Sequence, residues 1–226
     1  MLPDFLAAWG RVDGRIEPEH VMVTGPTRSG KSRFVRTILQ ARAQLRGSHV
    51  CMIATKPEDK TLRDYGWPII RKWPPPYGTD QFIFWVQTHR DPDVNKKIQR
   101  AEIRHVLHEL WTPGANMIVG FDELAYLDDS QELNLKTMTQ RYWREASALG
   151  ITVVAGTQRP RFVSLYGFTE SQWMAAFRPH DEMDGKRVAE VMGSKKVYYD
   201  QLMTLRHHEF ILRHIRTRQE VITKIE

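Results

Sequence analysis

The segment "GPTRSGKS", Gly25 to Ser32, constrains the fold of this chain more than any other part of its sequence. It fits the pattern G-x-x-x-x-G-K-[S/T], and it lies between an apolar run at residues 20–25 and a segment with helical periodicity. Glycines at these places let backbone N–H groups curl around phosphate oxygens, while the following helix presents its positive N-terminus to the same anion. We therefore expect a phosphate-binding loop that joins a buried strand to a helix.

Strands and helices alternate along the rest of the sequence. Apolar runs predict strands at residues 20–25, 48–55, 81–87, 116–123, 152–155, 208–215 and 219–225. Helical periodicity marks residues 34–45, 95–111 and 133–149, and a short helix is expected near 185–192. This alternation predicts an α/β fold with a mostly parallel central sheet, helices on both faces and a C-terminal β-hairpin on its edge. The chain has 226 residues, of which 41% are hydrophobic, so residues 1–226 are expected to form a single domain.

The cysteine content, hydropathy and charge of the sequence indicate in which compartment the protein acts and what kind of partner it binds. A single cysteine, Cys51, excludes an intrachain disulfide framework, and no apolar segment approaches the roughly 20 residues that a membrane-spanning helix needs. We expect an intracellular protein without a membrane span. Lys and Arg number 33 against 27 for Asp and Glu, which gives a net charge of +6. This balance fits a polyanionic partner and, equally well, an ordinary surface that is slightly basic.

The phosphate-binding loop predicts ATP and Mg²⁺ as ligands. Lys31 is placed to reach the β and γ phosphates, and Ser32 is placed to offer its hydroxyl to Mg²⁺. The expected nucleotide-binding residues are Gly25, Pro26, Thr27, Arg28, Ser29, Gly30, Lys31, Ser32 and Arg33.

An acidic pair ends a second apolar segment, "MIVGFDE". Asp122 is expected to hold Mg²⁺ directly or through water, and Glu123 is placed to take a proton from the attacking water. The alternative is that Glu123 only caps the helix that follows. The acidic pair, in a chain that already has a phosphate-binding loop, favours hydrolysis over a small-molecule kinase, which must avoid activating water.

A third segment, "TVVAGTQRP", is a buried strand that we expect to break at Gly156 and to deliver Gln158 and Arg159 at its end. In a parallel sheet of this type, such a strand commonly lies between the Asp–Glu strand and the strand of the phosphate-binding loop. Gln158 is then placed to hydrogen-bond both the lytic water and the γ-phosphate. The alternatives are that Gln158 satisfies backbone groups, and that Arg159 faces the nucleotide, a neighbouring subunit or only water.

Together, "GPTRSGKS", "MIVGFDE" and "GITVVAGTQRP", in this order, resemble the FtsK–HerA superfamily of P-loop DNA translocases. The resemblance continues more loosely through "AAFRPHDEMDGKRVAEVMG" and the closing "LRHHEFILRHIRTRQEVI". It departs at Pro26 and Arg28, where the family often has small or polar residues. The resemblance implies a RecA-like fold, ATP hydrolysis, double-stranded DNA as partner and a homo-oligomeric ring, expected to be a hexamer.

The chain resembles the genome-packaging ATPases of membrane-containing icosahedral viruses and phages in its size, and in that we expect no membrane anchor or added DNA-orienting domain. That likeness implies capsid or membrane-vertex proteins as further partners, and action in the host cytoplasm or in association with the virion. One alternative is an ATPase of conjugation, plasmid mobilisation or filamentous-phage assembly. Another is an ATP-binding switch or scaffold that moves no DNA. A switch or scaffold does not need a base that activates water, whereas a motor does. A role of Glu123 as such a base would therefore favour the motor.

Such rings usually complete each active site with an arginine from the neighbouring subunit. On the helix predicted at residues 133–149, Arg144 points away from the apolar face and Arg141 lies to one side. Arg144 is therefore the first candidate and Arg141 the second, ahead of Arg159 and Arg178. The alternative is that these arginines are simply solvated.

The C-terminal segment at residues 206–218 concentrates Arg and His. It is either a patch that faces DNA or solvated charge on an edge hairpin. His105 and His108 lie three residues apart on a helix without further ligands nearby in sequence, so they predict a polar helix face and no metal site.

Overall fold

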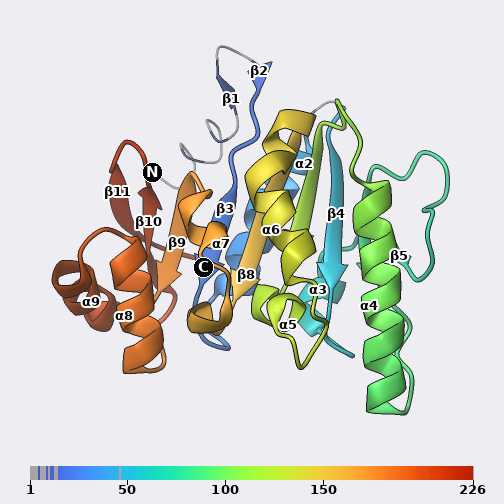
Figure 1. Ribbon diagram of the computed structural model, residues 1–226. Coiled ribbons are helices and arrows are strands. Elements are labelled where there is room, and N and C mark those ends of the chain that lie inside the picture. Colours follow the sequence, from blue (N-terminus) through green and yellow to red (C-terminus); the bar gives the residue numbers. More distant parts are fainter. Residues whose placement is uncertain (1–4, 6–8, 10, 13–14, 46, 226) are drawn as a thin grey trace.

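The computed structural model describes residues 5, 9, 11–12, 15–45 and 47–225 (Figure 1). Its strands are β1 (Arg11–Val12), β2 (Arg15–Ile16), β3 (Val21–Thr24), β4 (His49–Ala54), β5 (Ile69–Ile70), β6 (Gln81–Trp85), β7 (Met117–Phe121), β8 (Ile151–Thr157), β9 (Trp173–Phe177), β10 (Glu209–His214) and β11 (Glu220–Lys224). Its helices are α2 (Lys31–Ala43), α3 (Lys60–Arg63), α4 (Pro92–Glu109), α5 (Leu124–Asp128), α6 (Lys136–Glu145), α7 (Tyr166–Thr169), α8 (Glu182–Val191) and α9 (Lys195–Thr204), with 3₁₀ turns η1 (Ala146–Leu149) and η2 (Pro160–Phe162).

Within these residues, nine strands form one sheet in the order β11-β10-β9-β3-β8-β7-β4-β6-β5, and β1 and β2 form a separate antiparallel pair. The pairs from β9 across to β5 are all parallel, whereas β10 is antiparallel to both β9 and β11. The predicted fold is confirmed: a mostly parallel sheet with a C-terminal hairpin on its edge. The predicted position of β8, between β3 and β7, is also correct.

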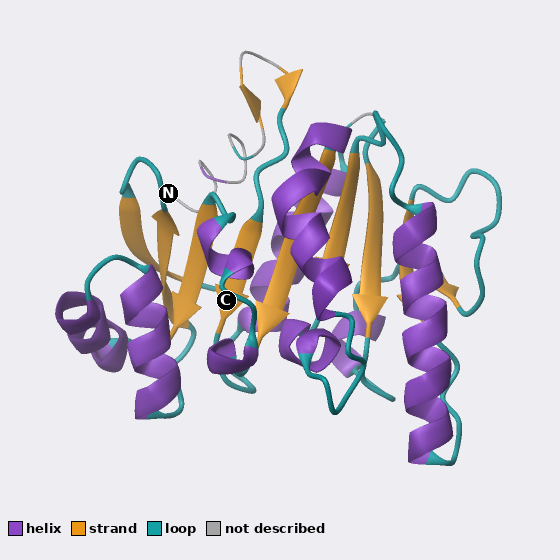
Figure 2. Cartoon of the chain, viewed as in Figure 1, coloured by secondary structure: helices purple, strands orange, loops and turns teal. Residues whose placement is uncertain are grey.

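Helices cover both faces of the sheet (Figure 2). Successive residues of a strand point to opposite faces, so a strand that is apolar throughout packs against helices on both sides. On β3, Val21 and Val23 belong to the apolar cluster beneath α2, with Phe34 and Ile38. Met22, between them, belongs to the opposite cluster, which includes residues of α4, α5, α6, α8 and α9. Every residue of β8 is buried, as expected for a parallel strand covered on both faces. No helix among the described residues is long and apolar enough to cross a membrane.

Three elements have boundaries that differ from the sequence-based expectation. The strand predicted to break at Gly156 continues through it to Thr157, and the helix predicted over residues 133–149 begins only at Lys136 and tightens into η1 after Glu145. Gly150 adopts φ 80° and ends this segment, in the left-handed conformation that glycine commonly takes after a helix. The helix expected near residues 185–192 begins earlier, at Glu182.

The buried side chain of His20, directly before β3, is hydrogen-bonded to β8 and makes the stability of the fold depend on pH. The Nδ1 atom of His20 accepts a hydrogen bond from the Val153 N–H at 3.0 Å, and burial lowers the pKa of His20 from 6.5 to about 4. The unfolded chain therefore takes up this proton first as the pH falls. The contribution of His20 to stability is complete above pH 6.5 and is lost as the pH falls toward 4.

We expect the free energy of unfolding of the wild type to drop by about 2 kcal/mol between pH 7 and pH 5, relative to His20→Asn. The Asn side chain keeps an acceptor for the Val153 N–H but does not titrate. Urea denaturation of both proteins at the two pH values measures the difference. An identical pH dependence in the two proteins would contradict a neutral, buried His20.

Candidate active site

The loop between β3 and α2 has the backbone shape that anion binding needs. Gly30 has φ 103°, and a Cβ atom there would lie 2.6 Å from Cγ2 of Ile225, so only glycine fits. Arg28 also lies in the left-handed region, at φ 64°. No side chain of the described residues caps the N-terminus of α2, which leaves its first N–H groups available to a ligand.

A cavity of about 400 Å³ lies against this loop. It is lined by residues 26–28 and 30–33 of the loop and the start of α2, and by residues from other elements: Arg36, Lys56, Asp59, Thr61, Asp64, Gln158, His207 and His208. A neighbouring cavity of about 420 Å³ continues past residues 26–29 to Arg178 and the start of β10. Gly25 lies beneath the loop, where a Cβ atom would meet the Ser29 side chain at 2.7 Å. The predicted nucleotide-binding residues thus line or support two neighbouring cavities.

Lys31 is buried at the base of the cavity, with 4% of its surface exposed. A Cβ atom on Gly156 would lie 3.0 Å from the backbone oxygen of Asp122 and 3.4 Å from the Lys31 Nζ atom, so the close approach of the Asp122 backbone favours glycine at this point of β8. Burial lowers the pKa of Lys31, and the carboxylates of Glu123 and Asp122 oppose that shift. A bound polyphosphate favours the charged ammonium in the same way.

Asp122 follows β7 and is almost fully buried. Its Oδ1 atom accepts hydrogen bonds from the Thr55 hydroxyl at 2.7 Å and the Thr55 N–H at 3.2 Å. Its Oδ2 atom is buried and has no hydrogen-bond partner among the described residues. Burial raises the pKa of Asp122. A buried carboxylate oxygen without a partner suits a hard cation that takes oxygen ligands.

The donor set fits Mg²⁺. Magnesium is usually held by one or two protein oxygens together with substrate phosphates and water, and Asp122 and the Ser32 hydroxyl supply such oxygens. The described residues contain no cluster of three or more His, Cys, Asp or Glu side chains that could hold a metal ion.

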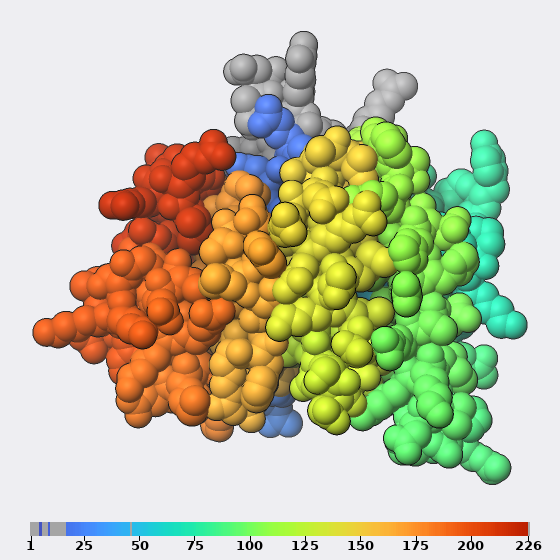
Figure 3. All heavy atoms as spheres, in the orientation of Figure 1, coloured from blue at the N-terminus to red at the C-terminus, as the bar shows by residue number. Residues whose placement is uncertain are grey.

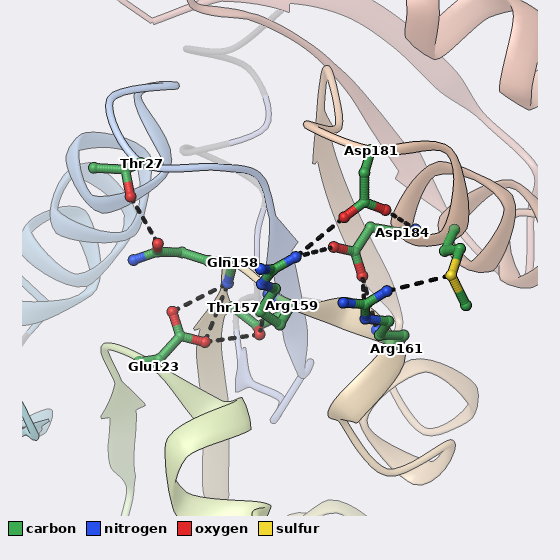
Figure 4. A network of polar contacts seen from close by, with 9 residues as sticks. Thr27, Glu123, Thr157, Gln158, Arg159, Arg161, Asp181 and Asp184 are labelled. Carbon is green, nitrogen blue, oxygen red and sulfur yellow. Dashed lines mark hydrogen bonds and ion pairs between the residues drawn. The ribbon is translucent and has the colours of Figure 1, made fainter.

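Glu123 is held by the end of β8 (Figure 4). Its carboxylate accepts a hydrogen bond from the Thr157 hydroxyl at 2.8 Å and from the Gln158 N–H at 3.1 Å to each oxygen. No side-chain hydrogen bond from Glu123 caps α5 in the described structure, so the alternative role as a helix cap is not supported. The contacts aim the carboxylate at the strand end where Gln158 lines the cavity.

Gln158 joins Glu123 to the phosphate-binding loop. Its backbone N–H contacts Glu123, and its side-chain Oε1 accepts a hydrogen bond from the Thr27 hydroxyl at 2.7 Å. In Figure 4 the side chains of Gln158 and Arg159 extend in opposite directions. A ligand that breaks the hydrogen bond between Thr27 and Gln158 would therefore act on Gln158, whose backbone N–H also holds the carboxylate of Glu123.

We expect Gln158→Ala to lower ATP turnover by about 10²-fold, the usual cost of losing one preorganised hydrogen-bond donor. If Gln158 senses the γ-phosphate, the variant also discriminates less between ATP and ADP. Steady-state turnover and binding of both nucleotides measure these effects. Thr27→Val is the matched control, because it removes the same hydrogen bond but keeps the amide. Unchanged turnover in Gln158→Ala would rule out a role in hydrolysis.

Arg159 turns away from the nucleotide cavity. It forms ion pairs with Asp181 at 3.1 Å and Asp184 at 3.5 Å, at the start of α8 (Figure 4). Asp181 also caps α8 by accepting a hydrogen bond from the Asp184 N–H at 2.8 Å. Of the three alternatives for Arg159, none describes this contact, since its partners are carboxylates of its own chain.

Arg141 and Arg144 lie on the exposed side of α6, as their helical positions predicted. Arg141 forms an ion pair with Glu145 at 3.3 Å, and the Arg144 guanidinium lies over the Tyr166 ring at 5.2 Å. The end of α6 leads through η1 into the start of β8, which lies at the end of the sheet opposite to the phosphate-binding loop because β8 runs parallel to β3 (Figure 1). Both arginines are remote from the cavity of their own chain, and their action in a neighbouring site stays a prediction.

The structure adds cavity residues that the sequence reasoning missed. Lys56, two residues beyond β4, pairs with Asp59 at 2.9 Å and faces the cavity beside the phosphate-binding loop. Burial acts to lower the pKa of Lys56, but Asp59 and the nearby carboxylates raise it overall. Lys56 could have been predicted as a cavity residue, because it follows an apolar strand. Asp122, Glu123 and Gln158 follow apolar strands in the same way. His207 and His208 reach the cavity because β10 runs antiparallel and begins at this edge.

The fold matches that of solved P-loop NTPase structures. The sequence matches no protein-family model and no curated protein. In structure the chain is similar to the genome-packaging NTPase B204 of Sulfolobus turreted icosahedral virus 2 in complex with AMPPCP, at a TM-score of 0.65 and 12% identity, covering 92% of this chain and 98% of that one. It is also similar to B204, the DNA-packaging ATPase from Sulfolobus turreted icosahedral virus, at a TM-score of 0.66 and 13% identity, covering 93% and 100%.

VirB4 of Thermoanaerobacter pseudethanolicus matches at a TM-score of 0.70 and 13% identity, covering 92% of this chain and 89% of that one. These likenesses extend over most of the chain. At 12–13% identity, they confirm the fold that the sequence predicts.

Proposed function

We propose that the protein is an ATP-hydrolysing motor that translocates double-stranded DNA, and that it packages a viral genome into a procapsid. The observation that carries the proposal is the chain of contacts from Thr27 through Gln158 to Glu123. It links the phosphate-binding loop to a carboxylate placed as a base, which a hydrolytic enzyme requires and a passive nucleotide-binding scaffold does not. The structural likeness to B204 over nearly the whole of both chains supports the packaging role.

Each residue has a defined part in the proposed hydrolysis. Lys31 and the loop N–H groups bind the phosphates of ATP, and Glu123 accepts the proton of the attacking water. Gln158 orients that water against the γ-phosphate. Asp122 and Ser32 would hold Mg²⁺, which when bound offsets phosphate charge.

The motor is proposed to act as a homo-oligomeric ring, expected to be a hexamer, in the host cytoplasm or in association with the virion. Capsid or membrane-vertex proteins are its proposed docking partners. In such a ring Arg144, or in second place Arg141, would complete the site of the neighbouring subunit. Mixing Arg144→Ala subunits with Lys31→Met subunits should then restore part of the activity that each variant lacks. Mixtures no more active than the separate variants would contradict a role of Arg144 in trans.

A conjugation ATPase is the second candidate, favoured by the structural similarity to the pCW3 conjugation coupling protein TcpA, at a TM-score of 0.55 and 20% identity. Both candidates share a site that hydrolyses ATP, and they differ in the partner that recruits the motor.

The ATPase rate with and without double-stranded DNA tests the proposal. We expect duplex DNA to stimulate turnover at low salt, and the stimulation to fall steeply as salt rises, since phosphate contacts release counterions. Native mass measured with nucleotide present reports the ring. A turnover rate indifferent to duplex DNA at low salt contradicts the translocase and favours a switch or scaffold.

A further inference from the structure

The outer face of α4 carries a row of cationic side chains. Lys97, Arg100 and Arg104, with His108 one turn further on, are all exposed and surround the small side chain of Ala101. We call these four residues the α4 basic face. The helix buries its other side through Asn95, Gln99, Ile103, Val106 and Leu107. Figure 3 shows the solvent-facing surface of α4 in green, on the right of the molecule.

Lys97, Arg100 and Arg104 of the α4 basic face form no ion pair with any other described residue. Among the described residues, no carboxylate oxygen lies within 4.0 Å of the cationic groups of Lys97, Arg100 or Arg104. Their helical neighbours differ, because Lys96 pairs with Glu132 at 2.6 Å and His105 lies 4.0 Å from Glu109. The remaining acidic residues of the helix are Asp93, in its first turn, and the half-buried Glu102. The face therefore presents three permanent positive charges to solvent.

The spacing of these charges suits a nucleic-acid backbone. A rise of about 1.5 Å per residue places Lys97 and Arg104 about 10 Å apart along the helix axis, with Arg100 between them. One strand of B-form DNA carries about three phosphates over the same axial length. Lys and Arg side chains are long enough to follow a phosphate row without fixed geometry, so the match in charge density is the relevant quantity.

The other basic segment offers a poorer surface. The C-terminal residues 206–218 were expected to form either a DNA-facing patch or solvated charge, but the fold disperses them. Arg213 is buried and pairs with Glu220, whereas His207 and His208 line the nucleotide cavity. Arg206, Arg216 and Arg218 are exposed, but they are separated: Arg206 lines the cavity that runs past residues 26–29, and the other two lie near the tip of the hairpin.

We infer that the α4 basic face contacts the phosphate backbone of duplex DNA. The inference rests on the proposed function, and it adds the surface through which the motor holds its substrate. The contact is independent of base sequence, because Lys97, Arg100 and Arg104 are cations suited to phosphate. It also lies outside the nucleotide cavity, so it acts on DNA affinity and on the stimulated rate without entering the chemistry of hydrolysis.

The test compares two variants with the same loss of charge. One is Lys97→Gln/Arg100→Gln/Arg104→Gln, and the matched control is Lys195→Gln/Lys196→Gln/Arg216→Gln, whose residues are exposed elsewhere. The probe is a random-sequence duplex, with affinity measured across a salt series. Removing three phosphate contacts should lower the slope of log K against log salt by about 2.7 and weaken binding at least about tenfold at low salt. DNA-independent ATP turnover should stay at the wild-type rate.

Three outcomes are decisive. The expected loss in the α4 variant, with the control variant close to wild type, supports the inference. Binding by the α4 variant that matches the wild type, or an equal loss in the control variant, overturns the inference and leaves the proposed function standing; the face then suits an acidic protein partner instead. A wild type that binds no duplex DNA at low salt overturns both.

Discussion

Glu123→Gln is expected to reduce ATP turnover by about 10² to 10⁴-fold, the contribution of a positioned general base. The amide keeps an oxygen that accepts the hydrogen bonds from Thr157 and Gln158, so the fold and the contacts at the end of β8 should persist. What is lost is the capacity to take a proton from water. ATP affinity should therefore remain within a few-fold of the wild type.

Single-turnover hydrolysis and nucleotide binding, measured on the same preparations, separate the two effects. Glu109→Gln is the matched control, because Glu109 lies on the exposed surface at the end of α4, away from the cavity. Turnover in Glu123→Gln within a few-fold of the wild type would mean that another group activates the water.

Lys31→Met is expected to lower ATP affinity by about 30-fold or more, which corresponds to at least about 2 kcal/mol for removing one partner of a buried charge pair. The ammonium of Lys31 lies at the base of the cavity, where burial lowers its pKa. A charge that burial disfavours costs stability in the absence of a bound anion. Methionine fills a similar volume without charge, so the melting temperature of the variant should be equal to or higher than that of the wild type.

Isothermal titration with ATP and thermal denaturation without nucleotide measure the two sides of this prediction. Lys60→Met, on the exposed start of α3, serves as the control for loss of one positive charge. Wild-type ATP affinity in Lys31→Met would contradict phosphate binding at this loop. A large fall in melting temperature would contradict the view that the buried charge is held at a cost for ligand binding.

Local patterns were sufficient to predict the parts of the site that one segment supplies. The strand, glycine loop and helix around Lys31 form a contiguous signal, and Asp122 and Glu123 follow directly on an apolar strand. The position of β8 between β3 and β7 was also predicted, and it is what brings Gln158 beside the phosphate-binding loop.

Other features depend on the order of strands in the sheet and have no local signature. Thr55 and Lys56 meet the site because β4 lies next to β7, although their sequence contains no phosphate-binding pattern. His207 and His208 approach it because the hairpin runs antiparallel to β9. The break predicted at Gly156 was wrong, because this glycine serves a close approach to Lys31 and Asp122 and leaves the strand conformation intact.

We propose that ATP hydrolysis moves this protein along duplex DNA. Displacement of a third strand from a triplex site on linear duplex DNA measures such movement directly. We predict that the wild type displaces the third strand when ATP is present, but not with a non-hydrolysable analogue, and that Glu123→Gln does not displace it with either. Vigorous ATP hydrolysis by the wild type, with the third strand left in place on DNA that the protein binds, would contradict the account.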